Sequence, residues 1–284
     1  MGRGDAVYSD AFNHASLIDG CRLSRAETRV FPHRDLHALG HLLRDDEGRF
    51  ARRMIVVDAV FSMDGDLFPL DGLVELAGAH GAWTYVDDAH GTGTMGPNGR
   101  GTAEHFGVED GIDVRMGTLG KALGTAGAFV AGSARLREWL LNRARPFVFT
   151  TGTPPALAAA TLQSLRILRE ERWRRDRLRE NARRLRAGLI LMGYDSPGEP
   201  DGHIVALPTG NAEATVRIGN VLRERGLLVG AVRPPTVPPG GSRLRITLSA
   251  AHTAEQIDQL LDALRTELPA PCSRAAKEMH RAGE

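Results

Sequence analysis

Short apolar runs alternate with longer amphipathic stretches over the first half of the chain. Five runs have the length and composition of β-strands, and they cover residues 54–59, 83–86, 114–118, 128–131 and 147–150. The stretches between several of these runs have helical spacing. Strands that alternate with helices are typical of a parallel sheet with crossover helices. The first half of the sequence therefore predicts an α/β domain.

A long helical stretch follows, from residue 154 to about residue 188. One face of it is apolar and contains Leu178, Ala182, Leu185 and Leu189. The other face is basic, because residues 166–186 include ten arginines and only four acids. Such a face is typical of a solvated helix that links two domains, and nucleic-acid binding is the alternative interpretation.

The last third of the chain predicts a smaller α/β unit. Its strands are expected at residues 203–207, near 227–232 and at 244–248, with a helix from Asn211 to a stop at Gly226. A final helix begins after Thr253, which forms a capping-box pattern with Gln256. The resulting domain prediction is a large domain over 1–153, a linking helix over 154–192, a small domain over 193–268 and a tail over 269–284.

The overall charge is nearly balanced, with 36 Lys+Arg against 35 Asp+Glu and a formal net charge of +1. This balance supplies no strong field for a polyanion, so we expect neither nucleic acid nor a membrane surface as a partner. Two cysteines, Cys21 and Cys272, make neither a disulfide framework nor a zinc motif. No signal segment is evident, and no apolar run reaches the ~18 residues of a membrane span. These features predict a cytoplasmic protein.

Polar clusters follow the predicted strands, which is where open α/β sheets bind ligands. Asp87 ends an apolar strand, and a buried carboxylate there needs a cationic or hydrogen-bonding partner. His90 follows three residues later. Lys121 lies in the small-residue segment 117–124, where its amine can approach a carbonyl group. A lysine, an acid and a donor are the groups that a pyridoxal phosphate site requires. A turn aspartate, a helix-start histidine and a solvated loop lysine are the structural alternatives.

Several ordered blocks resemble the α-oxoamine synthase family of fold-type I pyridoxal phosphate enzymes. The most specific are 87–93 (DDAHGTG), 96–101 (GPNGRG) and 117–124 (GTLGKALG), and others lie at 13–16, 61–65, 149–155 and 233–238. The similarity extends from Asp5 to about Leu268. It implies a fold-type I transferase, with a mainly parallel sheet in a large cofactor-binding domain, a smaller C-terminal α/β domain and a homodimer.

The resemblance also implies roles for the cofactor-binding residues. Lys121 would hold pyridoxal 5'-phosphate covalently and later move the Cα proton, with His90 and His14 as further catalytic residues. Asp87 would pair with the pyridinium nitrogen, and His14 would stack on the ring face opposite Ala89. The other cofactor contacts would come from Ser62, His90 and Thr118, and from Thr151 toward a neighbouring subunit's phosphate.

The substrate contacts implied by the resemblance lie in the small domain. Arg245 would bind the amino-acid carboxylate, and Thr236 would line the acyl site. Blocks 233–238 and 243–253 most resemble the family member that condenses L-alanine with a pimeloyl thioester in biotin biosynthesis. The thioester would be an acyl-CoA or an acyl-carrier-protein derivative. Glycine C-acetyltransferase or a related family member is the alternative enzyme, and a truncated, non-catalytic remnant or partner subunit is the alternative from another class.

Two departures from the family pattern stand out. Family members carry a glycine-rich phosphate-binding turn upstream of the position that matches Asp5, and this chain begins after it. We therefore expect the chain to be N-terminally truncated and to bind the cofactor weakly. The second departure is Asp58, because the family usually places a glutamate there.

His33, His37 and His41 recur at intervals of four residues. This spacing could place metal ligands on one helix face. No cysteine or carboxylate cluster accompanies them, and the resemblance assigns them no metal. We therefore expect no metal site.

Overall fold

The structure is a computed structural model that describes residues 1–195 and 197–268. The chain divides into two compact units. Unit 1 contains Met1–Ser62 and Leu67–Arg172, and unit 2 contains Met63–Asp66 and the described residues from Trp173 onward. The predicted tail over 269–284 lies outside the described residues.

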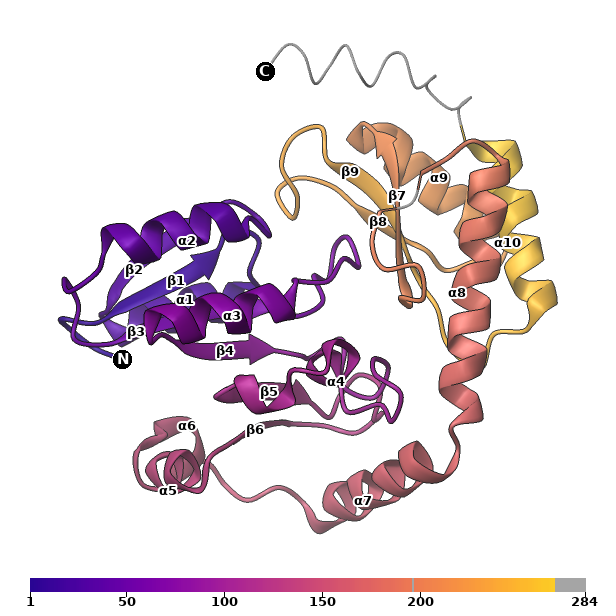
Figure 1. Cartoon of the computed structure of the whole chain (residues 1–284). Coiled ribbons are helices and arrows are strands. Elements are labelled where there is room, and N and C mark those ends of the chain that lie inside the picture. Colours follow the sequence, from indigo (N-terminus) through magenta and orange to yellow (C-terminus); the bar gives the residue numbers. More distant parts are fainter. Residues whose placement is uncertain (196, 269–284) are drawn as a thin grey trace. The chain divides into compact units, whose positions relative to one another are not determined.

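Unit 1 is built on a six-stranded sheet with the order β2-β1-β3-β4-β5-β6 (Figure 1). Its strands are β1 (Ala6–Asp10), β2 (Glu27–Phe31), β3 (Arg53–Asp58), β4 (Trp83–Asp87), β5 (Val114–Thr118) and β6 (Ala128–Gly132). All neighbours are parallel except β5 and β6. The predicted mainly parallel α/β sheet is confirmed, and β1 and β2 extend it beyond the strands expected from the sequence.

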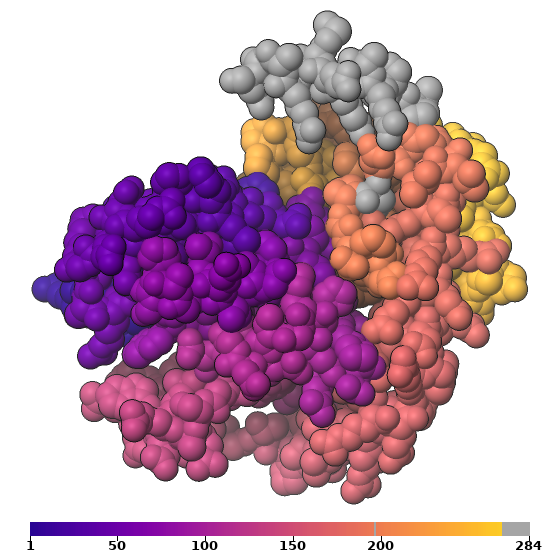
Figure 2. Space-filling model, in the orientation of Figure 1, coloured from indigo at the N-terminus to yellow at the C-terminus, as the bar shows by residue number. Residues whose placement is uncertain are grey.

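Helices α1 (Ala15–Ser24), α2 (Leu36–Asp45) and α3 (Leu70–His80) cover the two faces of this sheet. The other helices of unit 1 are α4 (Thr102–Phe106), the short 3-10 helix Glu109–Gly111, α5 (Ala134–Arg143), α6 (Arg145–Val148) and α7 (Pro155–Glu170). Alternation along β1 assigns the faces, because Tyr8 joins the core under α2 and α3 whereas Val7 packs with Leu17 and Cys21 of α1. Figure 2 shows the side chains of α2 and α3 covering one of these faces.

The strand expected at residues 147–150 is wrong. Residues Arg145–Val148 form the short helix α6, and the chain is irregular after it. Pro146 explains the difference, since its fixed φ and missing N–H suit the first turn of a helix. Phe147 and Phe149 are exposed and do not pair in the sheet.

Unit 2 contains an antiparallel three-stranded sheet with the order β7-β9-β8. Its elements are α8 (Trp173–Leu191), β7 (Ile204–Gly210), α9 (Ala212–Glu224), β8 (Gly230–Val232), β9 (Ser242–Thr247) and α10 (Ala254–Glu267). Leu185 of α8, Leu222 of α9 and Leu264 of α10 pack with Leu244 of β9 in one core. All three helices therefore cover one face of the sheet. The predicted capping box of Thr253 and Gln256 is present.

The segment expected as one linking helix is two helices, α7 and α8, separated at Glu171 and Arg172. Acids of unit 2 pair with part of the basic face of α8. Arg183 forms a two-pronged ion pair with Asp201 at 2.5 and 2.6 Å, and Arg184 forms another with Asp258. Among the described residues, no helix is long and apolar enough to cross a bilayer.

Candidate active site

Three carboxylates and a threonine end four of the five parallel strands of unit 1. Asp10, Asp58, Asp87 and Thr118 are the last residues of β1, β3, β4 and β5. Because the carboxyl ends of parallel strands meet at one edge of a sheet, these residues line the edge where ligands of α/β sheets bind. The predicted residues His14, Ser62, Ala89, His90 and Lys121 all lie in segments that directly follow these strands.

Asp87 is buried, and its Oδ1 accepts a hydrogen bond from the backbone N–H of Ala89 at 3.0 Å. Burial raises the pKa of Asp87, and the Ala89 bond and the positive charges of Lys121 and His14 oppose that rise. The structure therefore brings Lys121 and His14 within electrostatic reach of Asp87.

The loop that carries Lys121 connects β5 to β6 and is closed by its own hydrogen bonds. Leu119 N–H donates to the Gly127 carbonyl at 2.9 Å, and Thr125 N–H donates to the Leu119 carbonyl at 2.9 Å. Helix α7 holds the loop from outside, since Ser164 Oγ donates to the Leu123 carbonyl at 2.8 Å. Lys121 itself is exposed. A fixed loop thus presents an accessible amine at the sheet edge.

The loop after β4 is organised around the buried Asp88. Its carboxylate accepts hydrogen bonds from Thr102 N–H at 2.8 Å and Thr102 Oγ1 at 2.6 Å. Burial raises the pKa of Asp88 to about 7. Only glycine fits beside it, because a Cβ on Gly91 would lie 2.0 Å from Oδ1, and one on Gly101 would lie 1.8 Å from Oδ2.

The two loops touch each other at Gly93 and Ala122. A Cβ placed on Gly93, whose φ is +87°, would lie 2.8 Å from the Cβ of Ala122. This close approach places the segment that contains His90 beside the segment that contains Lys121. The absence of a side chain at Gly93 therefore allows the close packing of the two segments that carry candidate catalytic residues.

His14 is the N-cap of α1, and a network of buried polar groups fixes its backbone. Its N–H donates to Asp58 Oδ2 at 2.5 Å. Asn13 Nδ2 donates to the Val56 carbonyl at 2.7 Å, and Asn13 Oδ1 accepts from the Asp58 N–H at 2.9 Å. The imidazole is exposed and hydrogen-bonds to Ser16 Oγ at 2.8 Å.

Asp58 also lies close to Asp87, and the two are register partners on β3 and β4. Burial and the charge of Asp87 raise the pKa of Asp58 to about 7, against the hydrogen bond from His14 and the charge of Lys121. Sequence reasoning assigned no role to Asn13 or Asp58. A role for Asn13 could have been inferred from the block 13–16, in which Asn13 directly precedes the predicted ring-stacking residue His14.

The remaining predicted residues lie in different surroundings. Ser62 and His90 are half-buried, and Thr118 Oγ1 donates to the Gly127 carbonyl at 3.1 Å. Thr151 is exposed in the irregular segment after α6. Arg245 and Thr236 belong to unit 2. Arg245 donates to Thr247 Oγ1 at 2.9 Å, and burial lowers the pKa of its guanidinium.

The sheet edge fits the expected cofactor. Asp87 is a buried carboxylate to which no basic side chain of the described residues forms an ion pair. A protonated ring nitrogen would supply the missing cation. Ala89 is small enough to admit a flat ring, and His14 offers an exposed imidazole face. Lys121 is one of only two lysines in the sequence, and the other, Lys277, lies outside the described residues.

The three spaced histidines do not share one helix face. His33 precedes α2, hydrogen-bonds to Asp10 Oδ1 at 3.0 Å and stacks on Phe12. His37 and His41 lie on α2 with their Nε2 atoms 3.2 Å apart.

Comparisons with known proteins agree with this geometry. Residues 1–264 match the family described as aminotransferase class I and II. The 8-amino-7-oxononanoate synthase of Methylococcus capsulatus is 53% identical over 272 residues, which are 94% of this chain and 69% of that protein. Solved structures of serine palmitoyltransferase (SPT) are also similar. The Sphingomonas wittichii enzyme has a TM-score of 0.89 at 37% identity and covers 94% of this chain and 69% of its own. A structure of SPT with a PLP internal aldimine has a TM-score of 0.88 at 37% identity, with coverages of 94% and 67%.

Proposed function

The chain belongs to the class I and II aminotransferase family, and from this premise we propose that it is a pyridoxal phosphate-dependent acyltransferase. Its reaction is the decarboxylative condensation of L-alanine with a pimeloyl thioester to 8-amino-7-oxononanoate, a step of biotin biosynthesis. The named relative at 53% identity supports this reaction. The observation that carries the proposal concerns Asp87. This buried carboxylate forms no ion pair among the described residues and lies within electrostatic reach of Lys121.

Asp87 and His14 are proposed to hold the cofactor ring. When bound, pyridoxal phosphate supplies an electron sink for the negative charge that develops at the amino acid's Cα. As an anion, Asp87 would hold the proton on the ring nitrogen. His14 and Ala89 would contact the ring, and Ser62 and His90 would donate to the ring oxygen. Thr118 would contact the phosphate, and Thr151 would contact the phosphate of a neighbouring subunit.

Lys121 is the group that moves a proton. Its exposed amine is carried by a loop that α7 holds in place, so it can remain close to the Cα atom without a change in the fold. A positioned general base of this kind contributes ~10² to 10⁴ to the rate. Before the cofactor binds, the charge of protonated Lys121 favours the ionised form of Asp87, because it opposes the rise in the pKa of Asp87 that burial causes.

Arg245 and Thr236 are proposed to bind the substrates. A guanidinium binds a carboxylate through two parallel hydrogen bonds, and partial burial of Arg245 strengthens such a pair. Thr236 follows Arg233, whose carbonyl accepts a hydrogen bond from the Thr236 N–H at 3.0 Å. The thioester is a derivative of CoA or of an acyl carrier protein.

We also propose a cytoplasmic homodimer. Apolar side chains on β6, on α5, on α6 and directly after α6 are exposed, among them Val130, Trp139, Phe147 and Phe149. Contiguous exposed apolar surface is typical of an association site. A second copy would cover this surface and bring its Thr151 to the neighbouring phosphate.

Rates with four substrate pairs test the proposed function. Alanine and glycine are each combined with pimeloyl-CoA and acetyl-CoA, and release of free thiol is followed. We expect the fastest turnover with alanine and pimeloyl-CoA. One methyl group discriminates by ~1 to 3 kcal/mol, so the preference over glycine should be ~10- to 200-fold. Faster turnover with glycine and acetyl-CoA would assign the chain to the alternative enzyme, and no turnover with any pair would support the non-catalytic alternative.

A further inference from the structure

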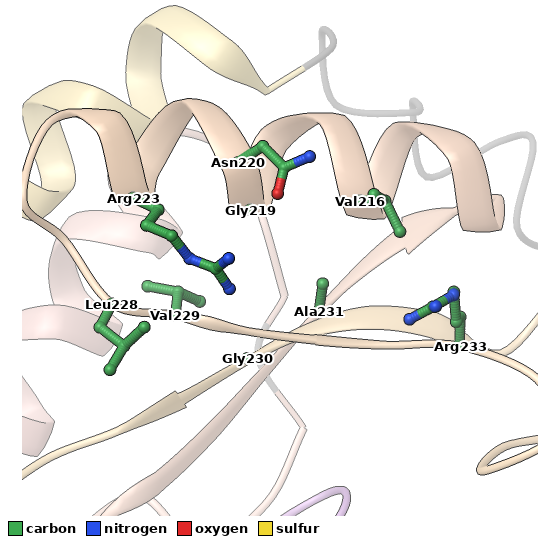
Figure 3. A pocket seen from close by; sticks show the side chains of 9 residues that line it. All are labelled: Val216, Gly219, Asn220, Arg223, Leu228, Val229, Gly230, Ala231 and Arg233. Atoms are coloured by element: carbon green, nitrogen blue, oxygen red, sulfur yellow. The ribbon is translucent and has the colours of Figure 1, made fainter.

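A groove of about 370 Å³ lies in unit 2, between α9 and the edge strand β8 (Figure 3). Two arginines line it. Arg223 comes from α9 and Arg233 directly follows β8, and Figure 3 shows both guanidinium groups extending toward the middle of the groove. None of the lining residues is acidic. Two positive charges thus converge on one concave surface.

These two arginines differ from the other arginines of unit 2. Arg183, Arg184, Arg217, Arg225, Arg243 and Arg265 all form ion pairs with carboxylates. Within the described part of the chain, Arg223 and Arg233 are the two arginines of unit 2 whose side chains have no hydrogen-bond or ion-pair partner. Among the described residues of unit 2, the two unpaired guanidinium groups therefore line the same groove.

The rest of the groove is formed by small and apolar residues. Gly219 brings α9 close to β8, since a Cβ on it would lie 3.2 Å from the Cβ of Ala231. Val216 and Leu228 form apolar walls, and Asn220 adds one neutral polar group. The volume lies within the ~300 to 1,000 Å³ of small-molecule sites. Such a groove has room for an organic body as well as for an anion.

The groove is separate from the proposed substrate residue Arg245. Directly opposite residues of an antiparallel pair share a sheet face. Ala231, which lines the groove, pairs with the buried core residue Leu244, whereas Arg245 pairs with Gly230. Ala231 therefore lies on the helix-covered face, and Arg245 lies on the opposite face.

We propose that this groove is a second ligand site, which binds the phosphate ester of a small organic molecule. A carboxylate has two oxygens, which accept the two parallel hydrogen bonds of a single guanidinium group. A phosphate monoester is a dianion with three free oxygens, so it can accept hydrogen bonds from Arg223 and Arg233 together. The apolar walls contact the organic part. An added peptide strand fits less well, because β8 is only three residues long.

Calorimetric titration of the full chain with AMP tests this site, with adenosine and inorganic phosphate as comparison probes. We expect one AMP to bind per chain, with adenosine and inorganic phosphate each binding about tenfold more weakly or less. Arg223→Gln and Arg233→Gln should each weaken AMP binding about tenfold or more, since each removes charge-assisted hydrogen bonds. Both positions are exposed, so the variants are expected to fold.

Two control variants distinguish binding in this groove from a general effect of charge and from binding at the proposed active site. Arg265→Gln removes the same charge from an exposed position of α10 and should change AMP affinity less than twofold. Lys121→Ala should also leave it unchanged, so the result does not depend on the proposed enzymatic function. The proposal is overturned if Arg223→Gln and Arg233→Gln bind AMP like the unmodified chain, or if an acidic peptide binds in the groove and AMP does not.

Discussion

Asp58 and Asp87 are register partners at the carboxyl ends of the adjacent parallel strands β3 and β4, and both are buried. The two carboxylates accept hydrogen bonds from different backbone N–H groups. Asp58 accepts the backbone N–H of His14, whereas Asp87 accepts that of Ala89 and has no ion-pair partner among the described residues. One carboxylate therefore positions the residue that is proposed to stack on the cofactor, and the other remains available for the ring nitrogen.

The raised pKa of Asp58 predicts a pH-dependent stability in the absence of cofactor. Its folded-state pKa of about 7 lies above the ordinary aspartate value of 3.8. Between these values the folded chain retains a proton that the unfolded chain has lost, so this contribution to stability falls as pH rises. The slope is at most ~1.4 kcal/mol per pH unit, and it ends above the folded pKa.

Asp58→Asn removes this titration. Relative to the unmodified chain, the variant should therefore gain free energy of unfolding as the pH is raised from 5 to 8. Urea unfolding at four pH values measures the difference. A difference that stays constant over this range would show that Asp58 does not titrate there.

Gly91→Ala should destabilise unit 1 and loosen the loop that carries His90. The new Cβ would lie 2.0 Å from Asp88 Oδ1 and 2.3 Å from Thr102 Oγ1. Overpacking of this kind costs ~1 to 3 kcal/mol. Gly78→Ala on α3 is the matched control, because a Cβ there meets nothing within 4 Å and a helical alanine is favoured by ~0.5 to 1 kcal/mol. Equal unfolding free energies for the two variants would contradict the packing role of Gly91.

Ser164→Ala should lower turnover more than it lowers stability. The hydroxyl of Ser164 anchors the Lys121 loop through the Leu123 carbonyl. Loss of one hydrogen bond costs ~1 kcal/mol of stability, whereas a displaced catalytic group can cost up to ~100-fold in rate. We expect kcat to fall about tenfold with KM little changed. Thr266→Ala, which removes a similar bond to the Asp262 carbonyl in unit 2, is the control. A kcat that matches this control would assign Ser164 a purely structural role.

The sequence predicted the parallel sheet because short, mainly apolar runs alternate with helical patterns, and several of these runs end in polar clusters. It missed β1 and β2, since the segments Ala6–Asp10 and Glu27–Phe31 mix apolar with polar or charged residues. It misassigned residues 147–150, where the helix-starting effect of Pro146 outweighs the β propensity of the residues that follow.

Site residues could be predicted from the sequence where they lie in short, distinctive blocks, as Asp87 and His90 do in 87–93 and Lys121 does in 117–124. The roles of these residues stay predictions. Long-range relationships were beyond sequence reasoning. Asn13 and Asp58 are 45 positions apart and meet only because β1 and β3 are neighbours. Likewise, Arg223 and Arg233 meet only through the packing of α9 on β8.

The most direct test of the account is the identity of the residue that binds the cofactor. The chain is incubated with pyridoxal phosphate, reduced with borohydride and mapped by peptide mass spectrometry. Because Lys121 and Lys277 are the only lysines, the assignment has few possible outcomes. We predict one pyridoxyl group per chain on the peptide that contains Lys121, with the label lost in Lys121→Ala and retained in Lys277→Ala. A label on Lys277 or on the N-terminal amine, with Lys121 unmodified, would contradict the account.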